Sequence, residues 1–248
     1  MSLPKIEGIY NYCDRWCERC TFTSRCAIFE KDKKHPDQKT RAFQERLGEN
    51  ILKANAILRK AAQDAGLNME AAQARIDESV RRNEQIEIEV RQHPMMTLSA
   101  QYIVTGREWL KRQPGMLEHL EDLKTQLTIG METNEGAKRE TRVIKESLAA
   151  IQWYLDFIHD RLSRALEGKL MSLEGQGMNA DGPRDHDGSA KIAIIAIDRS
   201  IEAWSELFTI LPEEEDHFLK VLSMLERIKK SAIGEFPLAT SFMRPGFD

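Results

Sequence analysis

The segment IKESLAAIQWYLDFIHDRLSRA, residues 144–165, decides the fold of this chain. Its apolar residues recur at alternating steps of four and three, the spacing of one buried face of an α-helix. This seam comprises Ile144, Leu148, Ile151, Leu155, Ile158, Leu162 and Ala165. Trp153 and Phe157 fall on roughly the opposite side of the same helix. A helix that is apolar on two faces is expected to be central in a bundle or to face a partner chain.

Two helices with the same spacing are expected to follow. Their seams are Ile194, Ile197, Ile201, Trp204, Phe208 and Leu211, and then Phe218, Val221, Leu225, Ile228 and Ala232. Pro212 and the acidic residues directly after it suit the N-terminus of the second of these helices. The tail from Gly234 is predicted to be extended and to pack back on the bundle through Phe236, Phe242 and Phe247.

Residues 37–92 are predicted to form an antiparallel helical hairpin with a thin, alanine-rich seam. Gly66 supplies the C-terminal cap of the first helix and Asn68 the N-cap of the second. Its seams are Phe43, Leu47, Ile51, Ala54, Leu58 and Ala61, and then Met69, Ala72, Ile76, Val80, Asn83, Ile86 and Val90. His93-Pro94 ends the hairpin, because proline disfavours helical geometry in the residue before it.

Two more helices are expected between the hairpin and the central helix. The apolar residues of the first are Met96, Ala100, Ile103, Val104 and Leu110, and those of the second are Met116, Leu120, Leu123 and Leu127. The sequence thus predicts an all-α protein with about seven helices and no strands. We divide it into a cysteine-rich head (1–36), the hairpin (37–92), a bundle (93–233) with a polar loop at 168–188, and a tail (234–248).

Composition and charge exclude several classes of function. The net charge is 36 − 40 = −4, so no overall positive field favours nucleic acid. The first residues carry no apolar leader, and the longest apolar run, Ile192 to Ile197, is far too short to cross a bilayer. We therefore expect a cytoplasmic protein with no membrane and no nucleic-acid partner; a protein partner or a homo-oligomer stays open.

The strongest chemical signal is a cluster of cysteines near the N-terminus. All four cysteines of the chain are Cys13, Cys17, Cys20 and Cys26, with the spacing C-x3-C-x2-C-x5-C. In a reducing compartment such a cluster indicates metal ligands in preference to disulfides or ordinary thiols. Four soft sulfur ligands this close in sequence can close around one metal centre. We therefore predict that these four cysteines hold a metal.

The identity of the metal is less constrained than the ligands. Structural zinc sites more often use two C-x2-C pairs separated by a longer loop, whereas iron–sulfur clusters are often wrapped by compact runs of cysteines. The spacing favours a [4Fe–4S] cluster, with zinc as the alternative. The first three cysteines resemble the cluster motif of radical S-adenosylmethionine enzymes. However, the alternating strands of that family are absent from the pattern, and a fourth cysteine would occupy the iron that it leaves open.

Two weaker constellations accompany the cysteines. Asp156-x-x-His159 and Glu214-x-x-His217 match the spacing used by di-iron helical bundles, with Glu108, Asp198 or Glu202 as further ligands. A simpler interpretation is acid at a helix start together with two boundary histidines, which we favour. The acidic segment Asp181–Asp187, with Asp185 and His186, could hold a cation or an anion, although a solvated loop that caps the next helix is favoured over either.

These observations lead to one main functional expectation and two alternatives. The main expectation is a helical metalloprotein with a binding, regulatory or redox-sensing role. The alternatives are a di-metal carboxylate oxidoreductase with an accessory iron–sulfur cluster, and a zinc-stapled scaffold protein. A catalytic residue cannot be assigned from the sequence.

Overall fold

The structure is a computed structural model and describes residues 4–34, 41–66, 68–112, 119–125, 134–173 and 184–248. These residues lie in α-helices, short 3-10 helices and turns, and there is no strand among them. The all-α class expected from the apolar spacing is therefore confirmed.

The chain divides into two compact units, which are described separately. The first consists of Met1–Asn11, Arg15–Ile88 and Pro245–Phe247, and the second of Tyr12–Asp14, Glu89–Arg244 and Asp248. The short segment Tyr12–Asp14 thus belongs to a different unit from the residues on either side of it.

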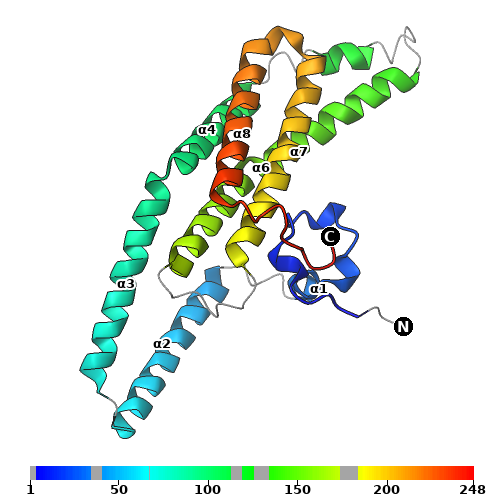
Figure 1. Cartoon of the computed structure of the whole chain (residues 1–248). Helices are drawn as coiled ribbons and strands as arrows, with labels where there is room; N and C mark the ends of the chain where they lie inside the picture. The colour runs from blue at the N-terminus through cyan, green and yellow to red at the C-terminus, as the bar shows by residue number, and fades with distance from the viewer. Residues whose placement is uncertain (1–3, 35–40, 67, 113–118, 126–133, 174–183) are drawn as a thin grey trace. The chain divides into compact units, whose positions relative to one another are not determined.

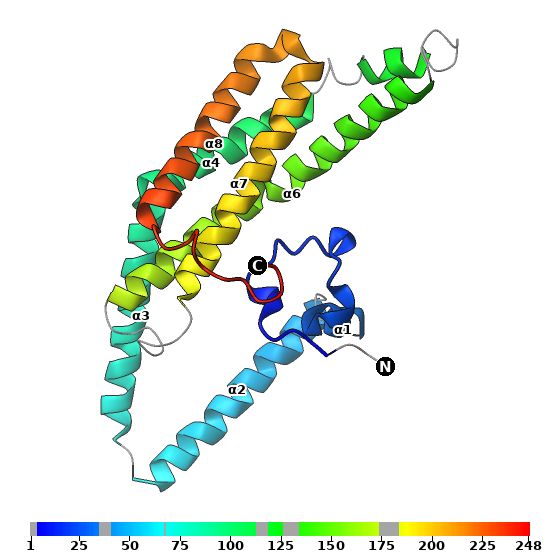
Figure 2. The same cartoon turned by 45° about the vertical axis from the view of Figure 1, so that its right-hand side comes forward.

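The second unit is a helical bundle (Figure 1 and Figure 2). Its long helices are α4 (Pro94–Arg112), α6 (Asn134–Leu173), α7 (Asp185–Ile210) and α8 (Glu215–Glu235). Helix α6 contacts α4 and α7, and helix α8 contacts the same two helices, so the four surround one core. A 3-10 turn, Pro212–Glu214, precedes α8, and residues 119–125 are also helical.

The core of the bundle follows the predicted seams of α6, α7 and α8. All seam residues of α8 are fully buried, and so is the α6 seam except for half-buried Leu148. In α7, Ile201 and Phe208 are half-buried and the rest of the seam is buried. Helix α4 packs on the core with a different face from the one predicted. Of its predicted apolar residues, Ala100 and Val104 are exposed. The buried residues of α4 are Met95, Met96, Ser99, Tyr102, Gly106 and Trp109.

Small and polar residues on this α4 face have specific partners, which explains why it is buried. The Tyr102 hydroxyl accepts a hydrogen bond from Trp204 Nε1 at 3.1 Å. Gly106 lets α4 approach α6 closely, since a Cβ atom there would lie 2.6 Å from Cδ1 of Leu155. Close packing and satisfied polar groups therefore favour this face over the more apolar Ala100 and Val104.

Helices α6 and α7 extend into the segment 168–188 that the sequence predicts to be a loop. Helix α6 continues to Leu173, and α7 begins at Asp185. Gly168 is helical, and a Cβ atom there would lie 3.4 Å from His186 Cβ. Residues 174–183, including Asp181, lie outside the described residues.

The first unit contains the cysteine-rich segment and two long helices. Helix α1 spans Ala27–Lys34, α2 spans Arg41–Asp64 and α3 spans Met69–Gln92, with the last four residues of α3 in the second unit. The predicted caps are confirmed: Gly66 adopts a left-handed φ of 69°, and Asn68 Oδ1 accepts a hydrogen bond from Ala71 N at 3.0 Å. Beyond this turn α2 and α3 diverge (Figure 1 and Figure 2).

The tail contributes to both units. Phe236 and Phe242 are buried in the bundle unit, as the sequence predicts. In the first unit, Phe247 packs edge-on against Phe22, with ring centroids 5.1 Å apart.

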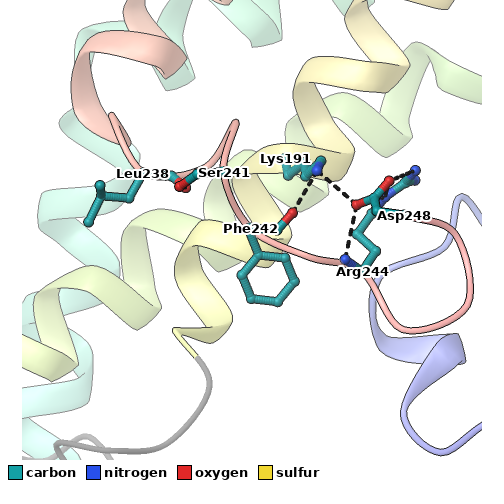
Figure 3. Close-up of polar contacts among 6 residues, drawn as sticks. All are labelled: Lys191, Leu238, Ser241, Phe242, Arg244 and Asp248. Carbon is teal, nitrogen blue, oxygen red and sulfur yellow. Dashed lines mark hydrogen bonds and ion pairs between the residues drawn. The ribbon is translucent and has the colours of Figure 1, made fainter.

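The end of the tail is bound to α7 by Lys191 (Figure 3). The Lys191 ammonium donates to the Phe242 carbonyl at 2.6 Å and to Asp248 Oδ2 at 2.7 Å. Arg244 also binds Asp248, with 2.8 Å between Nη2 and Oδ1. These bonds to cations hold the pKa of the Asp248 carboxyl well below its ordinary value; the Arg244 bond is the largest influence.

Candidate functional site

The cysteine-rich segment is organised by short turns and not by regular helix. The 3-10 helices Cys17–Arg19 and Thr23–Arg25 each end directly before a cysteine. In those turns the N–H groups of Cys20 and Cys26 bond to the carbonyl oxygens of Cys17 and Thr23. Each turn thus holds the backbone of the cysteine that follows it.

Two local features constrain the cysteines further. Arg15, between Cys13 and Cys17, has a φ of 58°, a left-handed conformation that residues other than glycine rarely adopt. The backbone N–H of Phe22 donates to Cys20 Sγ at 3.4 Å. N–H donors of this kind stabilise sulfur that carries negative charge, as a thiolate or metal-bound sulfur does.

None of the four cysteines forms a disulfide, and all four are half-buried. Cys13 belongs to the second unit, and the other three belong to the first. Among the described residues, no three side chains of the types His, Cys, Asp and Glu are arranged to hold a metal ion. The role of the four thiols as metal ligands therefore stays a prediction.

Asp14, directly after Cys13, is bound to the bundle by three groups. Its backbone carbonyl oxygen accepts a hydrogen bond from Trp153 Nε1 at 2.8 Å. Its carboxylate Oδ2 accepts from the Tyr154 hydroxyl at 2.8 Å and from the Arg199 guanidinium. Arg199 Nη1 also donates to the Tyr154 hydroxyl oxygen at 2.6 Å. Helices α6 and α7 therefore hold the residue beside the first cysteine.

The Asp14 cluster changes the titration of its neighbours. Burial, together with the negative charge of Asp14, raises the pKa of Tyr154 to about 12. Partial burial lowers the pKa of Arg199, but its bonds to Tyr154 and Asp14 outweigh this effect and the pKa is raised overall. Arg199 consequently keeps its positive charge across the physiological pH range.

Tyr12 forms a second attachment on the other side of Cys13. Its hydroxyl donates to Asp185 Oδ1 at 3.0 Å, and Arg164 Nη2 binds the same carboxylate at 2.9 Å from Oδ2. The Tyr12 ring packs edge-on against Phe242, with centroids 4.7 Å apart. Burial, followed by the charge of Asp185, raises the pKa of Tyr12 to about 12.

Gly188 makes the space that Tyr12 fills. A Cβ atom at position 188 would overlap the Tyr12 ring and lie 2.8 Å from Phe242 Cζ. The first turn of α7 therefore has no room for any side chain at this position. Tyr12 and Asp14 together bind Cys13 to the bundle from both sides, and we call the segment Tyr12–Asp14 the anchor.

The histidines and carboxylates proposed for a di-metal site have other partners. Asp156 binds Arg107, whose Nη2 lies 2.6 and 2.7 Å from the two carboxylate oxygens. His159 Nδ1 lies 2.7 Å from the hydroxyl of buried Ser99. The remaining pair, Glu214 and His217, lies beside Trp109.

Glu214 accepts a hydrogen bond from the Trp109 indole, and the His217 ring stacks on Trp109 with centroids 5.8 Å apart. Desolvation by burial lowers the pKa of His217. Of the further candidate ligands, Asp198 pairs with Lys229 at 2.7 Å and Glu108 with Arg112 at 3.8 Å, and Glu202 is exposed. The structure therefore does not bring these residues together as a ligand set.

The described part of the acidic segment has structural partners. Asp185 binds Tyr12 and Arg164, as above. Asp187 Oδ2 lies 3.2 Å from Arg184 Nε. Both carboxylates lie in the first turn of α7, where the helix dipole stabilises negative charge. These contacts agree with the helix-start interpretation of this segment.

Sequence reasoning missed the anchor. The aromatic pair Trp153-Tyr154 gave a partial signal, because Trp153 lies off the seam of a helix that is otherwise fully patterned. Nothing in the sequence pairs Arg199 or Tyr154 with a residue near position 14, since the contacts span 185 and 140 positions.

Comparisons with protein-family models, with curated proteins and with solved structures find no match to this chain. Among the helices that the structure describes, none combines the length and the apolar character that crossing a membrane requires.

Proposed function

We propose that this chain is a regulatory or binding metalloprotein. In this proposal one metal centre is bound by Cys13, Cys17, Cys20 and Cys26. The anchor then transmits to the helical bundle whether the metal is bound. A [4Fe–4S] cluster is the favoured centre and zinc the alternative, because of the compact cysteine spacing. The proposal includes a cytoplasmic location, where a reducing environment keeps the thiols available as ligands.

The observation that carries this proposal is the position of Asp14. It follows a candidate ligand directly, and α6 and α7 hold it through Trp153, Tyr154 and Arg199. Because one peptide bond joins Cys13 to Asp14, a backbone shift at Cys13 acts directly on the residue whose carbonyl accepts from Trp153. A change at the cysteines therefore reaches the helices through the covalent chain, with no further contact required.

We infer that the site forms when metal binds. Free thiols need not lie together in the absence of metal, and metal binding then supplies free energy that orders the segment. A closed set of four thiolates leaves no open coordination position, which supports a structural or sensing role over a catalytic one. The N–H donor to Cys20 Sγ supports the same chemistry.

Metal analysis of protein purified without oxygen tests the proposal. We expect about four iron and four sulfide per chain with visible charge-transfer absorbance for a cubane, or about one zinc per chain without colour. Removal of the metal should change tryptophan fluorescence, and Trp153→Phe should abolish most of that change. Protein that contains neither metal and binds neither on reconstitution would contradict the proposal.

A further inference from the structure

Helices α2 and α3 present apolar side chains to solvent along most of their length. From Leu47 to Gln85, every residue whose burial the structure describes is exposed, apart from half-buried Ala62. The large apolar residues among them are Leu47, Ile51, Leu52, Ile57, Leu58, Ile76 and Val80, and Leu52 is 70% exposed. Helices in proteins gain most of their stability from packing an apolar face, so this surface is expected to be covered in the functional protein.

The apolar residues of α2 are spread over more than one face. At 100° per residue, Leu47, Ile51 and Leu58 fall within a stripe about 40° wide. Leu52 lies about 140° from Leu47 around the helix, and Ile57 lies about 80° away on the other side. A single neighbouring helix covers only one of these faces. Closing α2 onto α3 of the same chain would therefore leave large apolar side chains in water.

The two helices carry opposite charge. Helix α2 contains five Lys or Arg and three Asp or Glu, which gives 5 − 3 = +2. Helix α3 contains four Arg and six Asp or Glu, which gives 4 − 6 = −2. A surface formed by one positive and one negative helix is complementary to itself across a two-fold axis, because α2 of one copy then faces α3 of the other.

We propose that a second copy of this chain covers this surface, with the two α2–α3 pairs forming an intermolecular four-helix assembly. Each 24-residue helix is about 36 Å long and offers a contact strip about 10 Å wide. Two such helices in each copy bury about 1,400 Å² in total, which falls within the usual range for a stable, specific interface. This dimer does not depend on the proposed metal centre.

The test is the mass of the full-length protein in solution. Sedimentation velocity across a concentration series should give a dimer, twice the chain mass of 28.5 kDa. The double variant Ile51→Glu/Leu58→Glu places charge in the apolar stripe and should raise the dimer dissociation constant by at least 100-fold. Lys60→Glu changes the charge of α2 by the same two units, about 160° around the helix from this stripe and away from Leu52 and Ile57, and serves as the matched control, with an unchanged constant.

Hydrogen exchange of the unmodified protein provides a second readout that does not depend on a variant folding. Amide protection over residues 47–85 should rise with protein concentration, while protection in α6 and α7 stays constant. A monomer at all concentrations would overturn the proposal, and so would a dimer that the double variant leaves intact. A monomer with concentration-independent protection of α2 would show that α2 and α3 close on each other within one chain.

Discussion

Trp153 donates its indole N–H to the backbone carbonyl oxygen of Asp14, and not to the Asp14 side chain. This bond therefore survives any substitution of the Asp14 side chain that keeps the backbone in place. The bonds from Tyr154 and Arg199 are made to the carboxylate instead. The two kinds of attachment can consequently be removed separately.

Asp14→Asn should weaken the anchor without removing it. The substitution keeps the size of the side chain but removes the charge that pairs with Arg199, so we expect a loss on the order of 1–3 kcal/mol in the free energy of unfolding. Urea unfolding followed by tryptophan fluorescence measures this loss, and trypsin cleavage after Arg15 should accelerate.

Glu18→Gln is the control for this variant, because Glu18 lies in the same cysteine-rich segment, is exposed and loses the same charge. It should leave both the unfolding curve and the cleavage rate unchanged. Equal effects of the two substitutions would show that net charge, and not the anchor, is responsible.

Cys17→Ser should disorder the cysteine-rich segment while the bundle stays folded. The segment has few buried apolar residues of its own, so a metal centre would be its main source of order. Limited proteolysis should show rapid cleavage at Arg15, Arg19 and Arg25, and far-ultraviolet circular dichroism should be nearly unchanged. A segment that remains protected in this variant would show that the cysteines do not hold it.

Gly106→Ala should destabilise the bundle, because the added methyl group would lie 2.6 Å from Cδ1 of Leu155. Leu155→Ala alone should cost about 2–5 kcal/mol, as buried leucine truncations do. In the double variant each change offsets part of the other, since the new methyl group enters the space that Leu155 leaves. Thermal or urea unfolding of all four proteins should give a coupling of about 0.5–3 kcal/mol.

Gly234→Ala is the control for the packing effect. A Cβ atom there has nothing within 4 Å, and Gly234 lies in helix α8. This substitution should leave stability unchanged or raise it by about 0.5–1 kcal/mol, because alanine is the better helix former. Additive effects of Gly106→Ala and Leu155→Ala would contradict the close contact of α4 and α6.

Stability should fall above pH 10 because three tyrosines hold their protons more tightly in the folded chain. Burial raises the pKa of Tyr12, Tyr102 and Tyr154 from 10 to about 12. The tyrosines of the unfolded chain lose their protons near pH 10, whereas those of the folded chain keep them until about pH 12. The stabilisation is therefore complete below pH 10 and declines between pH 10 and 12.

Chemical unfolding at several pH values in this window measures that decline, and tyrosinate absorbance follows the ionisation directly. Tyr154→Phe removes one of the three groups and should make the decline shallower. An identical slope in this variant would mean that Tyr154 ionises with the same pKa in both states.

Hydrophobic spacing was sufficient to predict the helices and most of the core. The 4-3 seams of α6 and α8 are buried almost completely, because apolar periodicity reports burial directly when one face of a helix packs. The helix caps at Gly66 and Asn68 could also be predicted from the sequence, since each depends on local backbone chemistry.

The same reasoning was wrong where burial does not follow apolar character. The buried face of α4 includes Ser99 and Gly106, which a hydrophobic pattern ignores. Ser99 is accommodated by His159, and Gly106 by the close approach of Leu155. Both depend on a partner helix about fifty positions or more away in sequence, which one helix alone does not reveal. The anchor contacts were unpredictable for the same reason.

A substitution at Gly188 would disturb the anchor selectively. Because even a methyl group at this position would displace the Tyr12 ring, Gly188→Ala acts on the anchor without altering any thiol, carboxylate or cation. A strain that carries this single change would separate the physiological role of the anchor from that of the cysteines themselves. If the proposed function holds, such an allele would distinguish a chain that no longer binds the metal from one that binds it without an effect on the bundle.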